Sequence, residues 1–337
     1  MNFSVTNNLE DERILNFILS DNRATIYHHP AWLKAISDGI NKEGRYLLIS
    51  ENQTIKGLIP FIIYHNKFVS LPFTTHCTPL LPEDIIFEDL ILQINQLFNK
   101  VKGFKFTFRE ENLSIPYQSV SDYYSHRIQL ENDVDKMFNS FLNRKIRRFI
   151  KRSNENGFIL KLGKDEKDLQ TFYKLECKLR KSLGLPPAPY KFFISLWKNL
   201  FPKDLMILPI VIKDSIPVAA SIVLKFKKEV IIEYTALDKK FINIYPNHFL
   251  HWEIIKKSIN EYRADTLDMG RTDKRQSGLI FFKESWNANR TNLIEVTNSK
   301  DKCLKQSFIY SCFRKINKLF PEKLLILEGK LLFKHFE

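Results

Sequence analysis

The feature that most constrains the fold is a repeated pattern of apolar runs and polar turns. The runs of the first copy cover residues 46–50, 54–64 and 68–71, and those of the second copy cover residues 205–212, 216–226 and 229–235. Polar turns at residues 51–53 and 213–215 separate the first two runs of each copy. Asn, Asp and Ser clusters between β-branched runs indicate hairpins. The chain is therefore predicted to contain two similar three-stranded units.

Helical patterns surround both copies. The predicted helices cover residues 30–38, 87–100, 166–183 and 249–262. This alternation predicts a mixed α/β (α+β) fold with helices flanking the sheets. We place the boundary near Gly157, which gives an N-terminal domain over residues 1–156, a C-terminal domain over residues 157–300 and a tail over residues 301–337.

Length and composition limit the class of protein. A chain of 337 residues with 44% apolar residues suits two domains with sizeable cores. Its four cysteines have no Cys-x-x-Cys spacing, so neither a disulfide framework nor a zinc site is expected. Residues 1–13 lack the pattern of a signal peptide, and no apolar run approaches the ~18 residues of a membrane span. A cytoplasmic protein is predicted.

The net charge of +14 favours anionic partners, which include nucleic acid, an anionic lipid surface and phosphorylated substrates. Much of this charge gathers on one predicted helix before the boundary. Its basic residues are Arg144, Lys145, Arg147, Arg148, Lys151 and Arg152. Ile146 and Ile150 form an apolar stripe on the same helix. A phosphate-binding helix and a solvated helix face are both consistent with this pattern.

The tail from residue 305 onward is a second basic and amphipathic segment. Phe313, Ile316 and Leu319 recur at helical spacing among lysines, and the pattern resumes after Pro321. Such helices pack on the body of a protein or lie on an anionic membrane surface. Peripheral contact with the inner membrane is therefore left open.

One short motif concentrates chemistry. It is Asp268-Met269-Gly270-Arg271-Thr272, followed by Phe282-Lys283 and Trp286. Gly270 allows a close backbone approach, Arg271 offers a planar fork for carboxylate or phosphate, and Lys283 offers a compact charge. The motif indicates a site for an anionic group, with a solvated strand end as the structural alternative.

This motif resembles the signature of the FemAB-like acyltransferases. They form a branch of the GNAT superfamily that includes aminoacyl-tRNA-dependent transferases of peptidoglycan cross-bridges. The family pattern is Asp-Phe-Gly-Arg-Ser, a short loop with a Gly, then Phe-Lys and Trp-Gly. Here Met269 replaces Phe, Thr272 replaces Ser, and Asn287 replaces the Gly after Trp286. The last replacement predicts a different turn at that point.

Three further segments match the family in the same order. They are residues 28–33, 143–148 and 246–252. The resemblance implies tandem GNAT-like domains with mixed sheets flanked by helices.

Chemistry without a covalent enzyme intermediate is expected, because no nucleophile triad or metal-ligand set is present in the sequence pattern. The resemblance implies that Lys283 stabilises the oxyanion or the donor phosphate. Arg271 is predicted to orient the acceptor, and Asp268 to hold Arg271 or accept the amine proton, with a salt bridge to a buried Arg as its structural alternative. Tyr234 is predicted as a hydrogen-bond partner across the cleft. The predicted substrate contacts are Arg271, Thr272, Phe282, Trp286, Arg144, Arg147 and Arg148.

Residues 238–247, where GNAT proteins usually bind the CoA pyrophosphate, contain no Gly. A backbone cradle for phosphate is therefore disfavoured, and an aminoacyl or larger acyl donor is expected over acetyl-CoA, with no tightly bound cofactor. The resemblance implies aminoacyl-tRNA as the donor, and acyl-CoA stays the open alternative. The predicted function is N-acyl or aminoacyl transfer to an amine on an anionic envelope precursor, either a peptidoglycan intermediate or a nucleotide- or lipid-linked amino sugar. The alternatives are an acyl-CoA-dependent enzyme of capsule or O-antigen biosynthesis and a non-catalytic module that binds glycan precursors.

Overall fold

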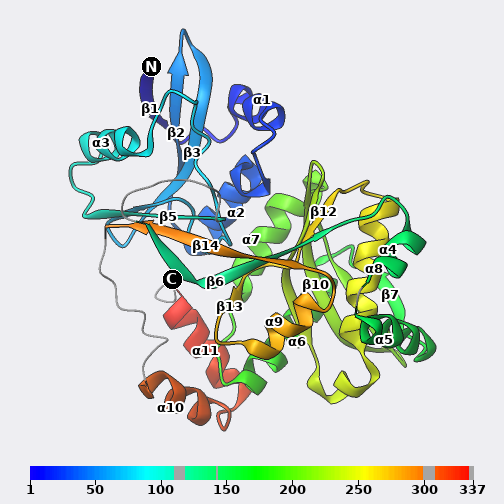
Figure 1. Cartoon of the computed structure of the whole chain (residues 1–337). Coiled ribbons are helices and arrows are strands. Elements are labelled where there is room, and N and C mark those ends of the chain that lie inside the picture. The colour runs from blue at the N-terminus through cyan, green and yellow to red at the C-terminus, as the bar shows by residue number, and fades with distance from the viewer. Residues whose placement is uncertain (110–117, 142, 299–307, 334–337) are drawn as a thin grey trace.

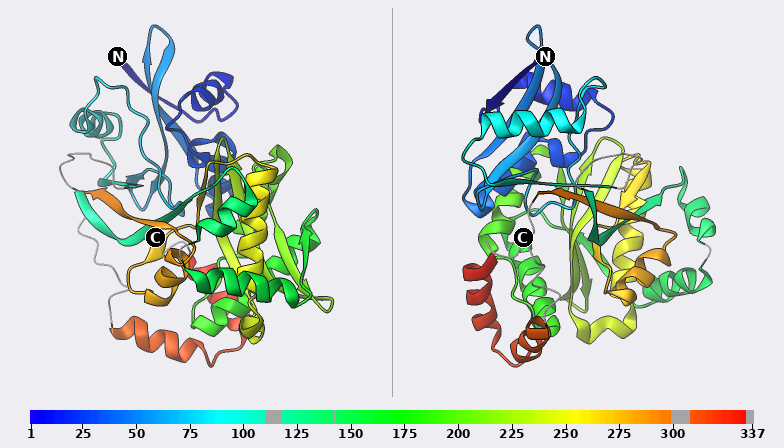
Figure 2. Two further views of the ribbon diagram at one scale, coloured as in Figure 1. Left: turned by 45° about the vertical axis from the view of Figure 1, so that its right-hand side comes forward. Right: turned by 60° about the vertical axis from the view of Figure 1, so that its left-hand side comes forward.

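A computed structural model describes residues 1–109, 118–141, 143–298 and 308–333 (Figure 1). Its strands form one mixed sheet in the order β1-β2-β3-β4-β5-β14-β6-β12-β11-β10-β9-β7, with β13 beside β6 and β8 beside β10. Helices cover both halves of this sheet (Figure 2). The predicted mixed α/β architecture is confirmed, and the sheets of the two halves are joined into one.

The first half begins with the strand β1 and two helices. Its elements are β1 (Asn2–Thr6), α1 (Glu12–Ser20), η1 (Ile26–His28), α2 (Pro30–Ile40), β2 (Gly44–Glu51), β3 (Thr54–Tyr64), β4 (Lys67–Val69), α3 (Phe87–Leu97), β5 (Gly103–Arg109) and β6 (Gln118–Gln129). Helix α2 starts at Pro30, which is preset for the first helical position, and the side chain of His29 accepts a hydrogen bond from the backbone N–H of Ala31.

The second half repeats the hairpin pattern. Its elements are α4 (Val134–Ser140), α5 (Arg144–Glu155), β7 (Ile159–Leu162), α6 (Glu166–Leu183), α7 (Tyr190–Leu200), η2 (Phe201–Lys203), β8 (Met206–Ile207), β9 (Pro209–Lys213), β10 (Ile216–Phe226), β11 (Glu229–Leu237), η3 (Lys239–Ile244), α8 (Pro246–Asn260), β12 (Thr266–Asp268), β13 (Thr272–Asp273), α9 (Ser277–Glu284), β14 (Asn289–Thr297), α10 (Phe308–Asn317) and α11 (Glu322–Leu332). The predicted runs and helices all fall on these elements.

Both predicted hairpins form, and their turns explain why. In the β2–β3 turn, Asn52 and Gln53 have φ of 46° and 66°, and in the β9–β10 turn Asp214 and Ser215 have φ of 48° and 64°. Two consecutive residues with positive φ give the turn whose twist matches antiparallel strands. The polar turn residues thus set the register of each hairpin.

The two halves exchange strands. Strand β6, the last strand of the first half, pairs with β12 of the second half, and β14, from the end of the second half, pairs with β5 of the first. The strands β6 and β14 also pair with each other and cross the centre of the molecule (Figure 1). Backbone hydrogen bonds therefore run without interruption from one half to the other.

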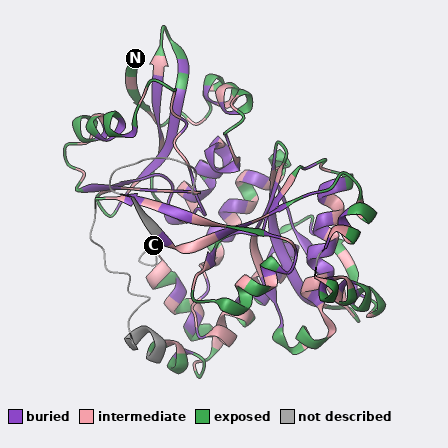
Figure 3. Cartoon of the chain, viewed as in Figure 1, coloured by how far each residue is buried: buried purple, intermediate pink, exposed green. Residues whose placement is uncertain are grey.

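The buried residues form cores on both sides of this junction (Figure 3). One core joins α1 and α2 to α6, α7 and the inner face of β10. A second gathers α8, β11 and β12 with α4 and α5, through Met137, Ile146 and Ile150 among others. The helices α4 and α5, which precede Gly157, therefore pack with the second half, while the division at residue 156 stays a prediction.

The tail folds back onto the body as α10 and α11, although residues 301–307 and 334–337 of the predicted tail lie outside the described residues. Two backbones approach closely there: a Cβ at Gly184 would lie 1.9 Å from the carbonyl oxygen of Arg314, and one at Gly329 would lie 2.0 Å from that of Pro187. Phe333 stacks on Phe73, with ring centroids 4.5 Å apart. Glycine is required at both contacts because a side chain would occupy the space of the neighbouring backbone.

We predict that Gly329→Ala loosens α11, because the added Cβ would overlap the Pro187 carbonyl. Overpacking of this kind costs about 1–3 kcal/mol. Hydrogen exchange of the α11 amides should accelerate and the melting temperature should fall. Gly278→Ala is the matched control, since no atom lies within 4 Å of its Cβ. Equal behaviour of the two variants would show that the tail is not held by this contact.

Candidate active site

The site forms where two parallel strands separate. Strands β11 and β12 pair only from Glu229 and Thr266 to Ile231 and Asp268. Beyond that point β11 continues to Leu237. The segment after β12 turns away from β11 at Gly270, which has φ of 72°. A Cβ at Gly270 would lie 3.0 Å from the carbonyl oxygen of Ile232. Glycine thus allows both the left-handed turn and the close approach to β11.

Glu233 is the extra residue of a β-bulge at this opening. On the neighbouring β10, Ile222 pairs with Tyr234 and Val223 pairs with Ile232, so Glu233 has no partner in the register. A bulge turns a side chain out of the regular alternation. The hydroxyl of Tyr27 donates a 2.7 Å hydrogen bond to Oε2 of Glu233. The bulge therefore directs a carboxylate from β11 toward the first half of the chain.

The environment of Glu233 changes its acidity. Burial raises the pKa of Glu233 to about 7, against the lowering effects of the Tyr27 hydrogen bond and of the positive charges of Arg271 and Lys283. The negative charge of Asp268 raises this pKa further. A carboxyl group that titrates near neutral pH is suited to general-base catalysis.

Asp268 is fully buried and ion-paired with Arg109, at the end of β5. Its other oxygen accepts a 2.6 Å hydrogen bond from the backbone N–H of Gly270, and the Ser125 hydroxyl lies 3.3 Å from Oδ2. Asp268 thus forms the salt bridge to an arginine that was its structural alternative. The arginine is Arg109, and not Arg271 as the first prediction had it. Its catalytic role stays a prediction.

Lys283 lies on α9 behind the Gly270 turn and is only 6% exposed. Its Nζ donates to the carbonyl oxygens of Gly270, at 2.7 Å, and Arg271, at 3.3 Å. Burial lowers the pKa of Lys283 to about 8, while the charges of Asp268 and Glu233 oppose this effect. The ammonium group of Lys283 therefore stabilises the Gly270 turn through these hydrogen bonds and stays mostly charged at neutral pH.

The other predicted residues of the turn differ in exposure. Arg271 is exposed, and its guanidinium lies 4.9 Å from the ring centroid of Tyr123. Thr272 is buried, with its hydroxyl 3.3 Å from Nδ1 of His126. Tyr234 packs edge-on against Phe193 at 5.4 Å, and burial raises its pKa. Arg271 is thus the member of this group that faces solvent.

Phe282 and Trp286 form part of an aromatic cluster beneath the turn. Trp286 is 0% exposed and packs against Phe141, and Phe282 lies 5.4 Å from the ring of His248. Their predicted contact with substrate stays a prediction.

The turn after Trp286 has left-handed backbone. Asn287 adopts φ of 59°, a conformation that favours glycine, which is the residue of the family pattern at this position.

The basic helix α5 adjoins the same cluster. Phe149 stacks on Tyr245 at 4.7 Å, directly before α8, and Arg148 lies over Phe149. Arg144 and Arg148 are exposed, while Arg147 donates to the carbonyl oxygen of Asn139. The structure thus places the helix beside the start of α8, and its binding of an anion stays a prediction.

The segment between β11 and α8 fits the CoA pyrophosphate poorly. It forms the 3-10 helix η3, and the side chain of Asp238 accepts a 3.1 Å hydrogen bond from the backbone N–H of Lys240. The carbonyl oxygen of Asp238 accepts from the N–H of Phe241. The Asp238 carboxylate therefore takes up the N–H of Lys240, and the Asp238 carbonyl takes up that of Phe241, so neither donor is free for a phosphate cradle at this end.

A cavity of about 930 Å³ lies beside Arg109, and residues of both halves line it. Arg109 and Arg127 line it, and both pair with Glu229. His76 also lines it, and within the described chain neither of its ring nitrogens has a hydrogen-bond partner.

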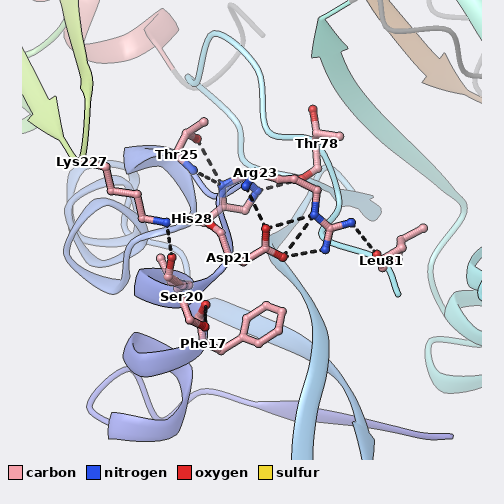
Figure 4. A network of polar contacts seen from close by, with 10 residues as sticks. Phe17, Ser20, Asp21, Arg23, Thr25, His28, Thr78, Leu81 and Lys227 are labelled. Carbon is pink, nitrogen blue, oxygen red and sulfur yellow. Dashed lines mark hydrogen bonds and ion pairs between the residues drawn. The ribbon is translucent and has the colours of Figure 1, made fainter. Parts of the chain in front are cut away.

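Polar contacts brace one wall of this cavity (Figure 4). Arg23 is ion-paired with Asp21 and donates a 2.7 Å hydrogen bond to the Leu81 carbonyl, and a ring nitrogen of His28 lies 2.8 Å from the Thr78 carbonyl. Lys227, from the β10–β11 turn, donates to the carbonyl of Asp21. The Lys227 contact joins the first half to the turn between β10 and β11, and β11 carries Glu233.

Sequence reasoning missed three residues of this site, which are Tyr27, Arg109 and Glu233. Glu233 carried a signal, because it is the single charge within the apolar run from Val230 to Leu237. Tyr27 and Arg109 carried none, since each reaches the site only through the exchange of strands and the packing of η1.

We predict that Arg109→Ala lowers the free energy of unfolding by about 3–5 kcal/mol, because it leaves the buried Asp268 carboxylate unpaired. Urea denaturation at neutral pH measures this loss. Adding Asp268→Asn should restore part of it by removing the charge. Arg13→Ala is the control, since its pair with Asp11 is at the surface, where an ion pair contributes little to stability. A loss no larger than that of the control would contradict the assignment.

Comparisons with known proteins agree with this geometry. Residues 140–283 match the family model described as an acetyltransferase (GNAT) domain. No curated protein sequence matches significantly.

Solved structures share the fold over most of the chain. FemX superposes with a TM-score of 0.67 at 13% identity, covering 93% of this chain and 100% of its own. The C-terminal domain of a putative lysylphosphatidylglycerol synthetase from Agrobacterium fabrum gives 0.57 at 10% identity, covering 86% and 92%. A tandem GNAT protein from the clavulanic acid pathway gives 0.52 at 8% identity, covering 89% and 100%. Residues 140–283 are thus similar to a GNAT acetyltransferase domain, and the chain shares the fold of FemX along most of its length.

Proposed function

We propose that the protein transfers an activated acyl or aminoacyl group to an amine on an anionic cell-envelope precursor. The observation that carries this proposal is the juxtaposition of a near-neutral carboxylate, Glu233, with two cations, Lys283 and Arg271, where β11 and β12 separate. Acyl transfer to an amine needs a proton acceptor, a positive charge near the oxyanion and a means of orienting the acceptor.

Each group has a place in this reaction. The amine nitrogen attacks the carbonyl carbon of the donor ester, and Glu233 accepts the proton that the amine loses. The positive charge of Lys283, which is hydrogen-bonded to the Gly270 turn, stabilises the negative charge that develops on the carbonyl oxygen of the donor. The bond to the leaving group then breaks, and the leaving oxygen takes up the proton that Glu233 received, which restores the carboxylate. Tyr27 fixes the carboxylate of Glu233 in position through its hydrogen bond.

An anionic acceptor suits the exposed surface of the site. The guanidinium of Arg271 faces solvent at the turn, and Arg144 and Arg148 are exposed on α5. Ring contacts connect α5 to α9, because Phe149 stacks on Tyr245, Tyr245 contacts His248, and His248 contacts Phe282 of α9. Forked guanidinium groups bind carboxylate and phosphate in two-point contacts. The motif from Asp268 to Trp286, with its resemblance to the FemAB-like enzymes, supports a precursor of peptidoglycan or of a related envelope glycan.

The direct test uses charged tRNA with labelled amino acids as donors and nucleotide- or lipid-linked amino sugars as acceptors. Transfer of the label to the acceptor amine by the purified protein is expected. Failure with every donor and acceptor pair, in a protein that binds the acceptors, would favour the non-catalytic module.

We predict a bell-shaped dependence of kcat/KM on pH. Glu233 must lose its proton to act as a base, so the rate should rise as the pH passes about 7, and Lys283 must keep its proton, so the rate should fall above about 8. Glu233→Gln should abolish the rise and lower the rate by roughly 10²–10⁴. Lys283→Met should abolish the fall and lower the rate by roughly 10²–10³.

Glu253→Gln provides the control for these variants, because Glu253 forms a surface pair with Lys256 on α8. Its profile should match that of the wild type. An acidic limb that persists in Glu233→Gln would remove Glu233 from the proton transfer.

We also predict that the protein binds CoA and acetyl-CoA weakly, because Asp238 takes up the N–H groups at the start of η3. Calorimetric titration measures this affinity. Asp238→Ala should bind CoA more tightly than the wild type, since a carboxylate is removed and the N–H of Lys240 is freed. Saturable micromolar binding to the wild type would instead support the acyl-CoA-dependent alternative.

A further inference from the structure

The tail presents an apolar surface to solvent. Its helices pack on the body through one face, where Leu325 and Gly329 are buried. The tail also exposes large apolar side chains, with exposed fractions of 37% for Phe313, 52% for Ile316, 84% for Leu319, 44% for Leu324, 52% for Leu327 and 67% for Leu331. Leu324, Leu327 and Leu331 share one stripe of α11 at helical spacing. A contiguous exposed patch of this kind marks an interaction surface.

Lysines lie among these side chains. Lys315, Lys318, Lys323 and Lys330 are all exposed on the same segment, while its acidic residues are Glu322 and Glu328. Glu328 is held inside the tail, where Asn317 donates a 3.1 Å hydrogen bond to it. The apolar surface is therefore bordered mainly by positive charge.

A pocket of about 440 Å³ continues this positive region onto the body. Lys318 and Glu322 form its tail side, and α6 and η3 form its other walls. Its lysines are Lys178, Lys181, Lys239, Lys240 and Lys318. Asp238, which is ion-paired with Lys178, and Glu322 also line the pocket, so its five lysines face two carboxylates and positive charge is in excess. This excess suits a phosphate headgroup next to the exposed Leu319.

We propose that the tail is an interfacial anchor that binds an anionic lipid surface. Phe313, Ile316, Leu319, Leu324, Leu327 and Leu331, which we name the tail face, enter the boundary between headgroups and acyl chains. The neighbouring lysines bind lipid phosphates. In the described chain no helix is both long and apolar enough to cross a bilayer, so the contact is with the membrane surface. The anchor holds the acyltransferase site close to the membrane.

The observations favour lipid over other occupants of the tail face. A second copy of the chain would bring its own lysines against these lysines, and like charges at an interface are unfavourable. Single-stranded nucleic acid is bound through aromatic platforms, whereas the tail face consists mostly of leucine and isoleucine. Aliphatic side chains bordered by lysine match the chemistry of an anionic bilayer.

Vesicle flotation of the full-length protein tests this inference without any need for turnover, so its outcome is independent of the proposed reaction. Vesicles of phosphatidylcholine alone are compared with vesicles that contain about 30% phosphatidylglycerol. The wild type should float with the anionic vesicles. The triple variant Leu319→Ser, Leu327→Ser, Leu331→Ser should bind the anionic vesicles with an affinity lower by about tenfold or more.

The matched control changes apolar residues of similar exposure elsewhere, through Leu19→Ser, Leu92→Ser and Ile159→Ser. It should bind as the wild type does. Lys318→Gln, Lys323→Gln and Lys330→Gln should reduce the preference for anionic vesicles by about fivefold per lysine. Circular dichroism checks that all variants are folded.

Three results would overturn the proposal. The first is a wild type that floats with neither vesicle, and the second is a control triple that loses as much binding as the tail triple. The third is a wild-type dimer, detected by light scattering, that the tail triple converts to a monomer, because the tail face would then be covered by a second copy.

Discussion

The exchange of β6 and β14 is the constraint on which the rest of the structure depends. Each half supplies a strand to the sheet of the other, so separating the halves would break backbone hydrogen bonds along both strands. This arrangement places Ser125 and His126 of β6 beside Asp268 and Thr272, and it brings Arg109 of β5 to the same point. Groups from distant parts of the chain are thereby held on one rigid sheet, as a preorganised site requires.

The two acidic groups of the site are treated differently by their surroundings. Asp268 is ion-paired with a guanidinium and accepts hydrogen bonds from a backbone N–H and a hydroxyl, which together fix its position. Glu233 accepts one hydrogen bond from Tyr27 and is close enough to Asp268 for that charge to raise its pKa. Asp268 therefore stabilises the Gly270 turn, and Glu233 is the carboxylate that exchanges a proton near neutral pH.

Much of the architecture could be predicted because its signals are local. The turn residues at 52–53 and 214–215 determine the hairpins, the apolar periodicity determines α2 and α6, and Pro246 marks the start of α8. The turn of the site was also predictable, since Gly270 and Lys283 stand in a recognisable motif. Asn287, which departs from that motif, adopts the left-handed conformation that glycine favours.

The strand exchange could not be predicted, because the pairing of β14 with β5 joins segments that are far apart in the chain and have no local signal. The same reason explains the partner of Asp268. Glu233 becomes distinctive only once the register with β10 reveals the bulge.

The titration of Glu233 in the free protein tests the central claim most directly. Carbon-13 labelling of the glutamate side-chain carboxyls allows each pKa to be measured by NMR without any substrate. One glutamate resonance should titrate near 7, as burial raises its pKa, and that resonance should be missing from Glu233→Gln. If the resonance that disappears in Glu233→Gln titrates near the ordinary glutamate value, Glu233 is not held as a neutral-pH base and the account of the site is wrong.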